Sequence, residues 1–181
     1  CEGKLSAEIL VVNNASTDRT SDIILQFKEV QEIPLAERVT ISAARNTGWK
    51  KAKNSIIAFI DSDVLITPTW VDTLITLEND FIDNTLLLTG YPYYLSEQPH
   101  WIETAWFANL MPSKHYINGG NIIITKTLLN EIGGFNETLI TAEDVDLCKR
   151  AQSHGATMRL DKNLMTHHEG NPKSIGHFFR R

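Results

Sequence analysis

The sequence predicts an α/β fold with a mostly parallel sheet. Short continuous apolar runs such as EILVV (8–12) are typical of strands that are buried on both faces of a sheet. These runs alternate with longer segments in which apolar residues recur at helical spacing, and the loops between them are short. Such alternation is typical of parallel strands with helices packed against them.

The first part of the chain predicts two strand–helix units and a further strand. The strand at 8–12 runs into NNASTDRTSD, whose Asn, Ser, Thr and Asp residues form turns and cap helix N-termini. The helix that follows has apolar residues at helical spacing: Ile23, Ile24, Phe27 and Val30. We then expect a short strand at 38–42, a basic helix at 43–54 that Ser42 can cap, and the strand SIIAFI (55–60).

The rest of the chain continues this pattern. Thr67 and Pro68 are a helix N-cap and a proline at the first helical position. Thr141, with Asp144 three residues later, is similar to the capping box of a helix that ends at Gly155. The other expected segments are strands at 86–90, 121–125 and 156–160, an aromatic excursion from the sheet at 91–106 that shapes a pocket, and a loop at 166–174.

Composition bounds the class of protein. The 181 residues, 42% of them hydrophobic, suit one globular domain, and a net charge of −5 (17 basic and 22 acidic residues) argues against a nucleic-acid-binding surface. No apolar run approaches the roughly 18–20 residues that span a bilayer, and no signal-peptide pattern opens the chain. Two cysteines, Cys1 and Cys148, cannot form a disulfide framework, which favours a reducing, cytosolic setting. Because the chain lacks an initiator Met and reaches a strand almost at once, we expect a fragment.

Polar side chains follow two of the expected strands. The first strand is followed by Asn13, Asn14 and Asp18, and the strand SIIAFI is followed by Asp61 and Asp63. Ligands of open α/β sheets bind outside the carboxyl ends of the strands. Two carboxylates in a D-x-D pattern offer hard oxygen ligands to Mg²⁺ or Mn²⁺ and leave positions for phosphate oxygens. The alternative is that Asp-Ser-Asp only forms the turn that ends the strand.

Further candidates lie late in the chain. Glu143 and Asp144 open an expected helix, either as acids that stabilise its dipole or as a general base that deprotonates a hydroxyl. His167 and His168 lie in an expected loop. They are either solvent-exposed or complete a metal site that the carboxylates begin.

Three other features have two interpretations each. Arg45 lies early in a helix that follows a strand, where it is either part of a solvated basic face or close to bound phosphates. The segment GGN (119–121) either lets the backbone approach a ligand closely or forms a tight turn. Trp101 and Trp106 either stack on a sugar or pack in the core.

These signals gain weight from their order along the chain, in four segments: EILVVNNASTD, ISAARNTGWKKAKNSIIAFIDSDVLITPTWV, GGNIIITKTLLNEIGGFNETLITAEDVDLCKRAQSHG and HHEGNPKS. Together they resemble the family-2 glycosyltransferases of the GT-A fold, over nearly the whole chain except residues 69–118. The resemblance implies a three-layer α/β/α Rossmann-like fold with a mixed, mostly parallel sheet, here without the family's first strand and helix. It also implies one catalytic domain (1–181), with a nucleotide-binding part at about 1–68 and an acceptor and catalytic part at about 69–181.

The resemblance also implies roles for the acids and histidines. The protein would be an inverting, metal-dependent transferase that moves a hexosyl group from a nucleotide sugar, a UDP-sugar, to an acceptor hydroxyl. Asp63 would bind the Mn²⁺ or Mg²⁺ that bridges the diphosphate, and Asp61 would bind the ribose or the outer shell of the metal. Asp144, beside Glu143 in the family's E-D motif, would be the base. His168 matches the family's late histidine near the metal, with His167 as the alternative.

Other residues would bind the donor. Gly120 and Asn121 would line the pocket of the donor sugar, Arg45 would lie near the nucleotide, and Asp18 follows the same strand as Asn13. The family usually has Asp where this chain has Asn13, and that carboxylate hydrogen-bonds the nucleobase. An amide offers both a donor and an acceptor, so Asn13 would recognise the base differently.

The resemblance implies bacterial cell-surface glycan synthesis, with a glycan or lipid-linked acceptor and no nucleic acid partner. The protein would be cytoplasmic, with peripheral association at the inner face of the membrane as the alternative; the sequence does not predict an oligomeric state. Two rival functions stay open at this point: a sugar-phosphate nucleotidyltransferase, and a catalytically silent module that binds nucleotide sugars or glycans.

Overall fold

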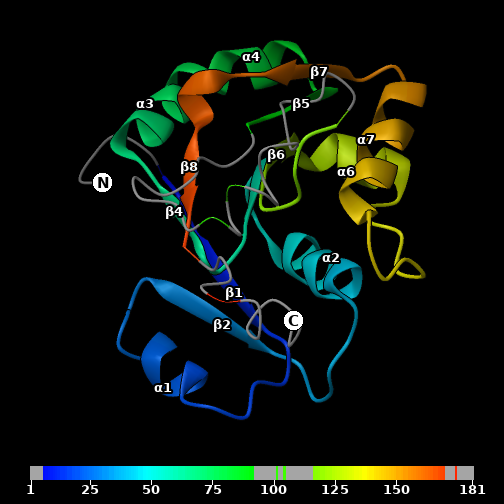
Figure 1. Ribbon diagram of the computed structural model, residues 1–181. Helices are drawn as coiled ribbons and strands as arrows, with labels where there is room; N and C mark the ends of the chain where they lie inside the picture. The colour runs from blue at the N-terminus through cyan, green and yellow to red at the C-terminus, as the bar shows by residue number, and fades with distance from the viewer. Residues whose placement is uncertain (1–5, 92–100, 102–103, 105–115, 170–173, 175–181) are drawn as a thin grey trace.

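The computed structural model describes residues 6–91, 101, 104, 116–169 and 174 (Figure 1). Its strands are β1 (Ile9–Asn13), β2 (Val30–Pro34), β3 (Ile56–Ile60), β4 (Val64–Ile66), β5 (Leu87–Gly90), β6 (Asn121–Thr125), β7 (Thr157–Leu160) and β8 (Thr166–His168). Its helices are α1 (Thr20–Ile24), α2 (Ile41–Lys51), α3 (Pro68–Thr76), α4 (Glu78–Asp83), α6 (Lys126–Ile132) and α7 (Glu143–Ser153), with a short 3-10 helix, η1 (Lys162–Leu164).

The central sheet has four strands in the order β3-β6-β5-β7. β6 is antiparallel to both β3 and β5, β5 is parallel to β7, and two separate pairs are β1 with β2 (parallel) and β4 with β8 (antiparallel). The mixed sheet is confirmed, but among the described strands antiparallel pairs outnumber parallel ones, which corrects the expectation of a mostly parallel sheet. In the β3–β6 pair, for example, β6 begins opposite the end of β3, with Asn121 opposite Ile60.

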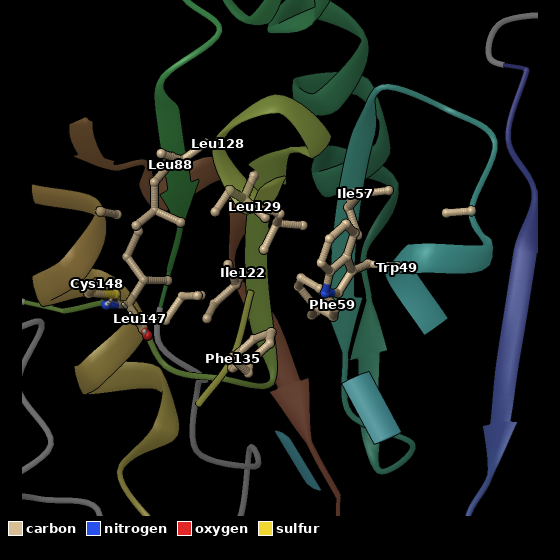
Figure 2. Packing of buried hydrophobic residues seen from close by; sticks show 14 residues of the cluster. Trp49, Ile57, Phe59, Leu88, Ile122, Leu128, Leu129, Phe135, Leu147 and Cys148 are labelled. Carbon is tan, nitrogen blue, oxygen red and sulfur yellow. Dashed lines mark hydrogen bonds between the residues drawn. The ribbon is translucent and has the colours of Figure 1, made fainter. Parts of the chain in front are cut away.

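Helices cover both faces of this sheet, so the three-layer α/β/α architecture is confirmed (Figure 1). Along β6, Ile122 and Ile124 pack under α2, α6 and α7, whereas Ile123 between them packs under α3 and α4. Figure 2 shows the first of these clusters, which includes Trp49, Leu128, Leu147 and Cys148. All three isoleucines are fully buried, and each such side chain contributes about 1.5–3 kcal/mol to folding.

Two expected features of the first part of the chain are wrong. The second strand is formed by Val30–Pro34 and not by residues 38–42. It pairs with β1, and Val30 lies opposite Ile9. Val30 continues the helical spacing of the preceding apolar residues, but pairing with β1 overrides that local pattern. Thr40 rather than Ser42 caps α2, because its side-chain oxygen accepts a hydrogen bond from the amide of Ala43.

The later helix signals are mostly confirmed. Thr67 caps α3 by accepting a hydrogen bond from the Trp70 amide, and proline occupies the first turn. Gly155 follows the end of α7 with a φ of 92°, a conformation that suits glycine. The capping box at Thr141 is wrong, since Ala142 precedes the helix with a φ of 60° and no side chain caps it.

The segment expected as a loop from residue 166 begins with strand β8. Most of the aromatic stretch at 91–106, including Trp106, lies outside the described residues, and Trp101 is exposed. Within the described part of the chain, no helix combines the length and the apolar character needed to cross a membrane.

Candidate active site

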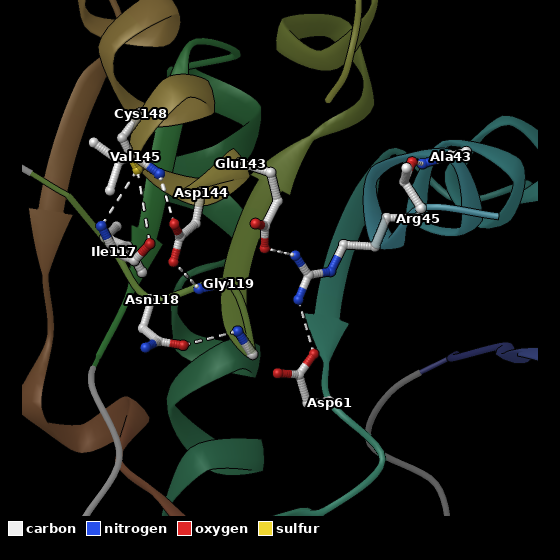
Figure 3. A network of polar contacts seen from close by, with 12 residues as sticks. Ala43, Arg45, Asp61, Ile117, Asn118, Gly119, Glu143, Asp144, Val145 and Cys148 are labelled. Carbon is white, nitrogen blue, oxygen red and sulfur yellow. Dashed lines mark hydrogen bonds and ion pairs between the residues drawn. The ribbon is translucent and has the colours of Figure 1, made fainter. Parts of the chain in front are cut away.

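Arg45 joins two segments that are far apart in the sequence (Figure 3). From α2, its Nη2 donates a hydrogen bond to Asp61 Oδ1 at 2.8 Å and its Nη1 donates to Glu143 Oε1 at 2.8 Å. The side chains of Arg45 and Glu143 are only 10% and 12% exposed, whereas that of Asp61 is 33% exposed. The guanidinium group of Arg45 therefore holds Asp61, which follows β3, together with Glu143, which begins α7.

Asp144 is held by backbone amides at the start of α7. Its Oδ2 accepts a hydrogen bond from the Gly119 amide at 2.9 Å, and its Oδ1 accepts one from the Val145 amide at 2.8 Å. A carboxylate at a helix N-terminus also interacts favourably with the helix dipole. These contacts orient Asp144 in the same network as Asp61 (Figure 3).

The loop before β6 connects the two acids. The Asp61 amide donates to the carbonyl oxygen of Gly120, and the Gly119 amide donates to Asp144. A Cβ atom on Gly119 would lie 2.9 Å from Nη1 of Arg45, closer than such atoms approach in proteins. Glycine at position 119 therefore allows the backbone to lie against the guanidinium group. The expected approach of GGN to a ligand stays a prediction.

Strand pairing brings Asp63 and His168 together. His168 lies opposite Val64 in the β4–β8 ladder, and the Glu169 amide donates to the Asp63 carbonyl at 2.8 Å. As a result His168 Nε2 lies 3.4 Å from Asp63 Oδ2. His167 is exposed, and because neighbouring side chains of a strand point to opposite faces, it points away from this pair.

Asp63 and His168 are the described residues that could hold a divalent cation. Within the described residues, no group of three or more His, Cys, Asp or Glu side chains is arranged to hold a metal. Asp63 and His168 nevertheless supply a carboxylate oxygen and an imidazole nitrogen, which are ligands that Mn²⁺ accepts. Such a two-ligand site fits a cation that completes its coordination shell with oxygens of a bound diphosphate or water.

The end of β1 has a different character. The Asn13 amide donates hydrogen bonds to Ser21 Oγ at 2.9 Å and to Glu32 Oε1 at 2.7 Å, and its oxygen accepts one from the Ser16 amide. Asn13 is 6% exposed. Hydrogen bonds from Asn13 and Ser21 hold the pKa of the Glu32 carboxyl below its ordinary value. The side chain of Asn13 is thus engaged within the fold.

Two neighbours of Asn13 also have structural partners. Asn14 exchanges hydrogen bonds with the backbone of Val39 through both ends of its amide, which ties the β1 loop to the segment before α2. Asp18 is exposed and accepts hydrogen bonds from the amide and hydroxyl of Thr20 at the start of α1, which lower the pKa of its carboxyl. No contact in the described residues connects Asp18 with the Arg45 network.

The side chain of Asn121 belongs to the core. It is fully buried, accepts a hydrogen bond from Trp70 Nε1 at 3.0 Å, and donates to the carbonyls of Tyr91 and Leu164. Its amide therefore holds α3 and η1 against β6. This arrangement does not support the expected contact with a donor sugar, because no side-chain surface of Asn121 is exposed.

Sequence reasoning missed Asn46, which lies beside Arg45 on α2, and Glu32, which bonds Asn13 at the end of β1. Asn46 is 3% exposed and holds the segment GGFNE (133–137) to α2 through hydrogen bonds with the backbone of Phe135 and with Glu137. Its side-chain oxygen also accepts a hydrogen bond from Trp49 of the same helix. Glu32 was missed because its strand was misplaced. The only available signal for Asn46 was its position beside Arg45 in the A-A-R-N stretch.

Comparison with solved structures defines the class of fold. The mannosyltransferase PcManGT of Pyrobaculum calidifontis superposes with a TM-score of 0.73 at 22% identity, over 96% of this chain and 50% of that one. TarS of S. aureus (residues 1–349) superposes with a TM-score of 0.61 at 18% identity, over 91% of this chain and 47% of that one. This likeness confirms the GT-A fold.

Sequence comparison defines the family. Residues 3–132 match the family model described as glycosyl transferase family 2. A pre-mycofactocin glycosyltransferase of Mycobacterium tuberculosis is 30% identical over 143 residues, covering 71% of this chain and 30% of the relative. The Escherichia coli glucosyltransferase WfaP is 29% identical over 178 residues, covering 93% of this chain and 67% of the relative. The chain therefore belongs to glycosyl transferase family 2, and it spans less than a third of the length of its mycobacterial relative.

Proposed function

We propose that this domain is an inverting glycosyltransferase that moves a sugar from a nucleotide sugar, a UDP-sugar, to an acceptor hydroxyl in bacterial cell-surface glycan synthesis. The observation that carries the proposal is the network that holds Asp61, after β3, and Asp144, at the start of α7, on either side of Arg45 and the Gly119 loop. This network supports the proposal because a single displacement requires the donor-binding acid and the base to be held in a fixed arrangement.

In the proposed reaction, Asp144 accepts the proton of the acceptor hydroxyl. The hydroxyl oxygen then forms a bond to the anomeric carbon on the face opposite the diphosphate. The bond from that carbon to the diphosphate oxygen breaks, and its electron pair leaves with the nucleoside diphosphate, so that the configuration inverts. Two backbone amides, those of Gly119 and Val145, orient the Asp144 carboxylate for the proton transfer.

Asp63 and His168 would hold a divalent cation, Mn²⁺ or Mg²⁺. When bound, such an ion offsets the negative charge that develops on the departing diphosphate. Asp61 lies two residues before Asp63 and is partly exposed, and its Oδ1 accepts a hydrogen bond from Arg45. Asp61 would bind the ribose or a water of the metal shell.

The names of related proteins support the donor and acceptor classes. PcManGT was solved with GDP-Man and Mn²⁺, and TarS with UDP-GlcNAc. WfaP is named as a transferase from UDP-Glc to GlcNAc-diphosphoundecaprenol, a lipid-linked acceptor. A UDP-sugar donor and a lipid-linked acceptor are therefore the first combination to test.

The test measures sugar transfer and donor hydrolysis by the purified full-length protein, across UDP- and GDP-sugars, with Mn²⁺ and with chelator. Asp144→Asn should lower transfer at least about 100-fold, because the general base is lost, while nucleotide binding stays intact. Asp72→Asn, which changes an exposed acid on α3, is the control and should transfer normally.

Other outcomes would overturn the proposal. Nucleotide-sugar binding without transfer to any acceptor would favour the silent binding module. Release of pyrophosphate from a nucleoside triphosphate and a sugar phosphate would favour the nucleotidyltransferase. Transfer by Asp144→Asn at the rate of the unmodified protein would show that the assignment of the base is wrong.

A further inference from the structure

We propose that Arg45 is a positioning residue for the transfer reaction: it fixes the donor-side acid Asp61 relative to the Glu143–Asp144 pair, and does not itself bind the donor phosphates. The inference rests on the proposed function and adds a residue to it. It also gives the side chain of Arg45 a role other than the expected position near the nucleotide.

Two carboxylates hold the guanidinium group of Arg45. Its two terminal nitrogens each donate to a different carboxylate at 2.8 Å, and these carboxylates come from segments 82 residues apart, Asp61 and Glu143. Arg45 and Glu143 are both nearly buried. A buried charge that loses its partner is strongly destabilised, so the three side chains hold one another in a fixed arrangement. A guanidinium group can bridge two carboxylates with fixed geometry, whereas the single ammonium group of Lys cannot.

The guanidinium group of Arg45 also packs against an aromatic ring of the core. The ring of Phe135, which is 2% exposed, lies with its centroid 5.3 Å from the guanidinium carbon. Phe135 also packs edge-on against Phe59 of β3, with ring centroids 5.0 Å apart. Arg45 is therefore anchored by the hydrophobic core as well as by the two acids, which restricts its movement toward a ligand.

The Gly119 loop extends the arrangement to Asp144. A Cβ atom at position 119 would lie 2.9 Å and 3.0 Å from the two terminal nitrogens of Arg45, so the loop backbone rests against the guanidinium group. The amide of the same glycine donates to Asp144 Oδ2, and the next residue, Gly120, accepts from the Asp61 amide. A displacement of Arg45 would thus shift both the acid on the donor side and the base.

The experiment compares Arg45→Lys with Lys51→Met, which removes an exposed charge at the end of the same helix. Transfer kcat, donor KM, the Kd for UDP with Mn²⁺ by calorimetry, and Tm are measured on each variant. We expect Arg45→Lys to lower kcat at least about tenfold, because the base and the donor are misaligned. The Kd and donor KM should change less than about threefold, and Lys51→Met should leave all four quantities unchanged.

A second variant tests the route through the loop. The φ of Gly119 lies outside the left-handed range, and the three heavy atoms nearest to an added Cβ all belong to Arg45, so Gly119→Ala acts mainly through this steric contact. We expect Gly119→Ala to lower kcat in the unmodified protein but to have a much smaller effect when combined with Arg45→Lys. Such non-additivity is the signature of two residues that act through one contact.

Three results would overturn the inference while leaving the proposed function intact. A Kd for UDP with Mn²⁺ that weakens as much as kcat/KM falls would mean that Arg45 acts through donor binding and not by positioning the base. A lower Tm with unchanged kcat per folded molecule would make it only a structural residue. Additive effects of the two substitutions would remove the coupling through the loop. If the unmodified protein transfers no sugar in this assay, the proposed function fails, and the inference fails with it.

Discussion

The carboxyl ends of β1 and β3 both carry polar residues, but the two ends use them differently. At the end of β1, the buried amide of Asn13 makes all its hydrogen bonds within the fold. At the end of β3, the carboxylates of Asp61 and Asp63 remain 33% and 38% exposed, although Arg45 lies against the first and His168 against the second. The same local pattern, an apolar strand followed by polar residues, therefore supports the fold at the end of β1 and forms a candidate binding site at the end of β3.

The chemistry of the side chains explains this difference. An amide carries no net charge, so it can be buried once its donors and acceptor are satisfied. A carboxylate is costly to bury without full compensation, which favours a partly exposed position near a cation. We therefore expect substitutions at the end of β1 to lower mainly stability and those at the end of β3 to lower mainly function.

The largest expected effect follows substitution of Asp63. Asp63→Ala should lower transfer at least about 100-fold and abolish the dependence of nucleotide binding on Mn²⁺, because a proposed metal ligand is removed. The free energy of unfolding should change by less than about 1 kcal/mol, since the side chain is partly exposed. Calorimetric titration of UDP with and without Mn²⁺ and urea unfolding measure the two quantities. A large loss of stability with unaltered metal dependence would contradict the distinction between the two strand ends.

The sequence predicts those parts of the two strand ends whose residues lie close together along the chain. The strand and the D-x-D after it are contiguous, so the end of β3 was predictable from periodicity and residue type. The pairing of Asp63 with His168 was not, because it depends on β8, a three-residue strand in a segment that is locally typical of a loop. Likewise, the partners of Arg45 come from segments that only the tertiary fold brings together.

The end of β1 shows the same limit. The family pattern marks Asn13 as a departure, but the physical reason for the amide lies in Glu32, on a strand that the sequence predicts elsewhere. Because Glu32 accepts a hydrogen bond from position 13, a donor is needed there. An Asp at this position would place two carboxylates in contact, which disfavours ionisation of both. The departure is therefore explained by a partner on the neighbouring strand.

A smaller effect is expected for Asn13. Asn13→Ala should lower the free energy of unfolding by about 2 kcal/mol, because the hydrogen bonds of a buried amide are lost and their partners are left unsatisfied. Urea unfolding measures this change, and Asn79→Ala, at an exposed position of α4, is the matched control. Any transfer activity should fall only in proportion to the folded fraction. A variant that stays as stable as the unmodified protein but no longer distinguishes nucleobases would instead restore Asn13 as the residue that recognises the base.

The smallest expected effect is a pH dependence at the end of β1. Hydrogen bonds from Asn13 and Ser21 hold the pKa of Glu32 in the folded protein below its ordinary value of 4.5. The ionised form is therefore favoured by folding, so its contribution to stability is present above pH 4.5 and is lost as the pH falls through the lower, folded-state pKa.

Between about pH 5 and pH 3, the unmodified protein should lose more stability than Glu32→Gln, because Gln keeps a hydrogen-bond acceptor but does not titrate. The measurement is the Tm across this range, with the exposed Glu29→Gln as control. Parallel curves for the unmodified protein and Glu32→Gln would mean that the amide of Asn13 does not favour the charged form of Glu32, and the contrast between the two strand ends would then depend on burial alone.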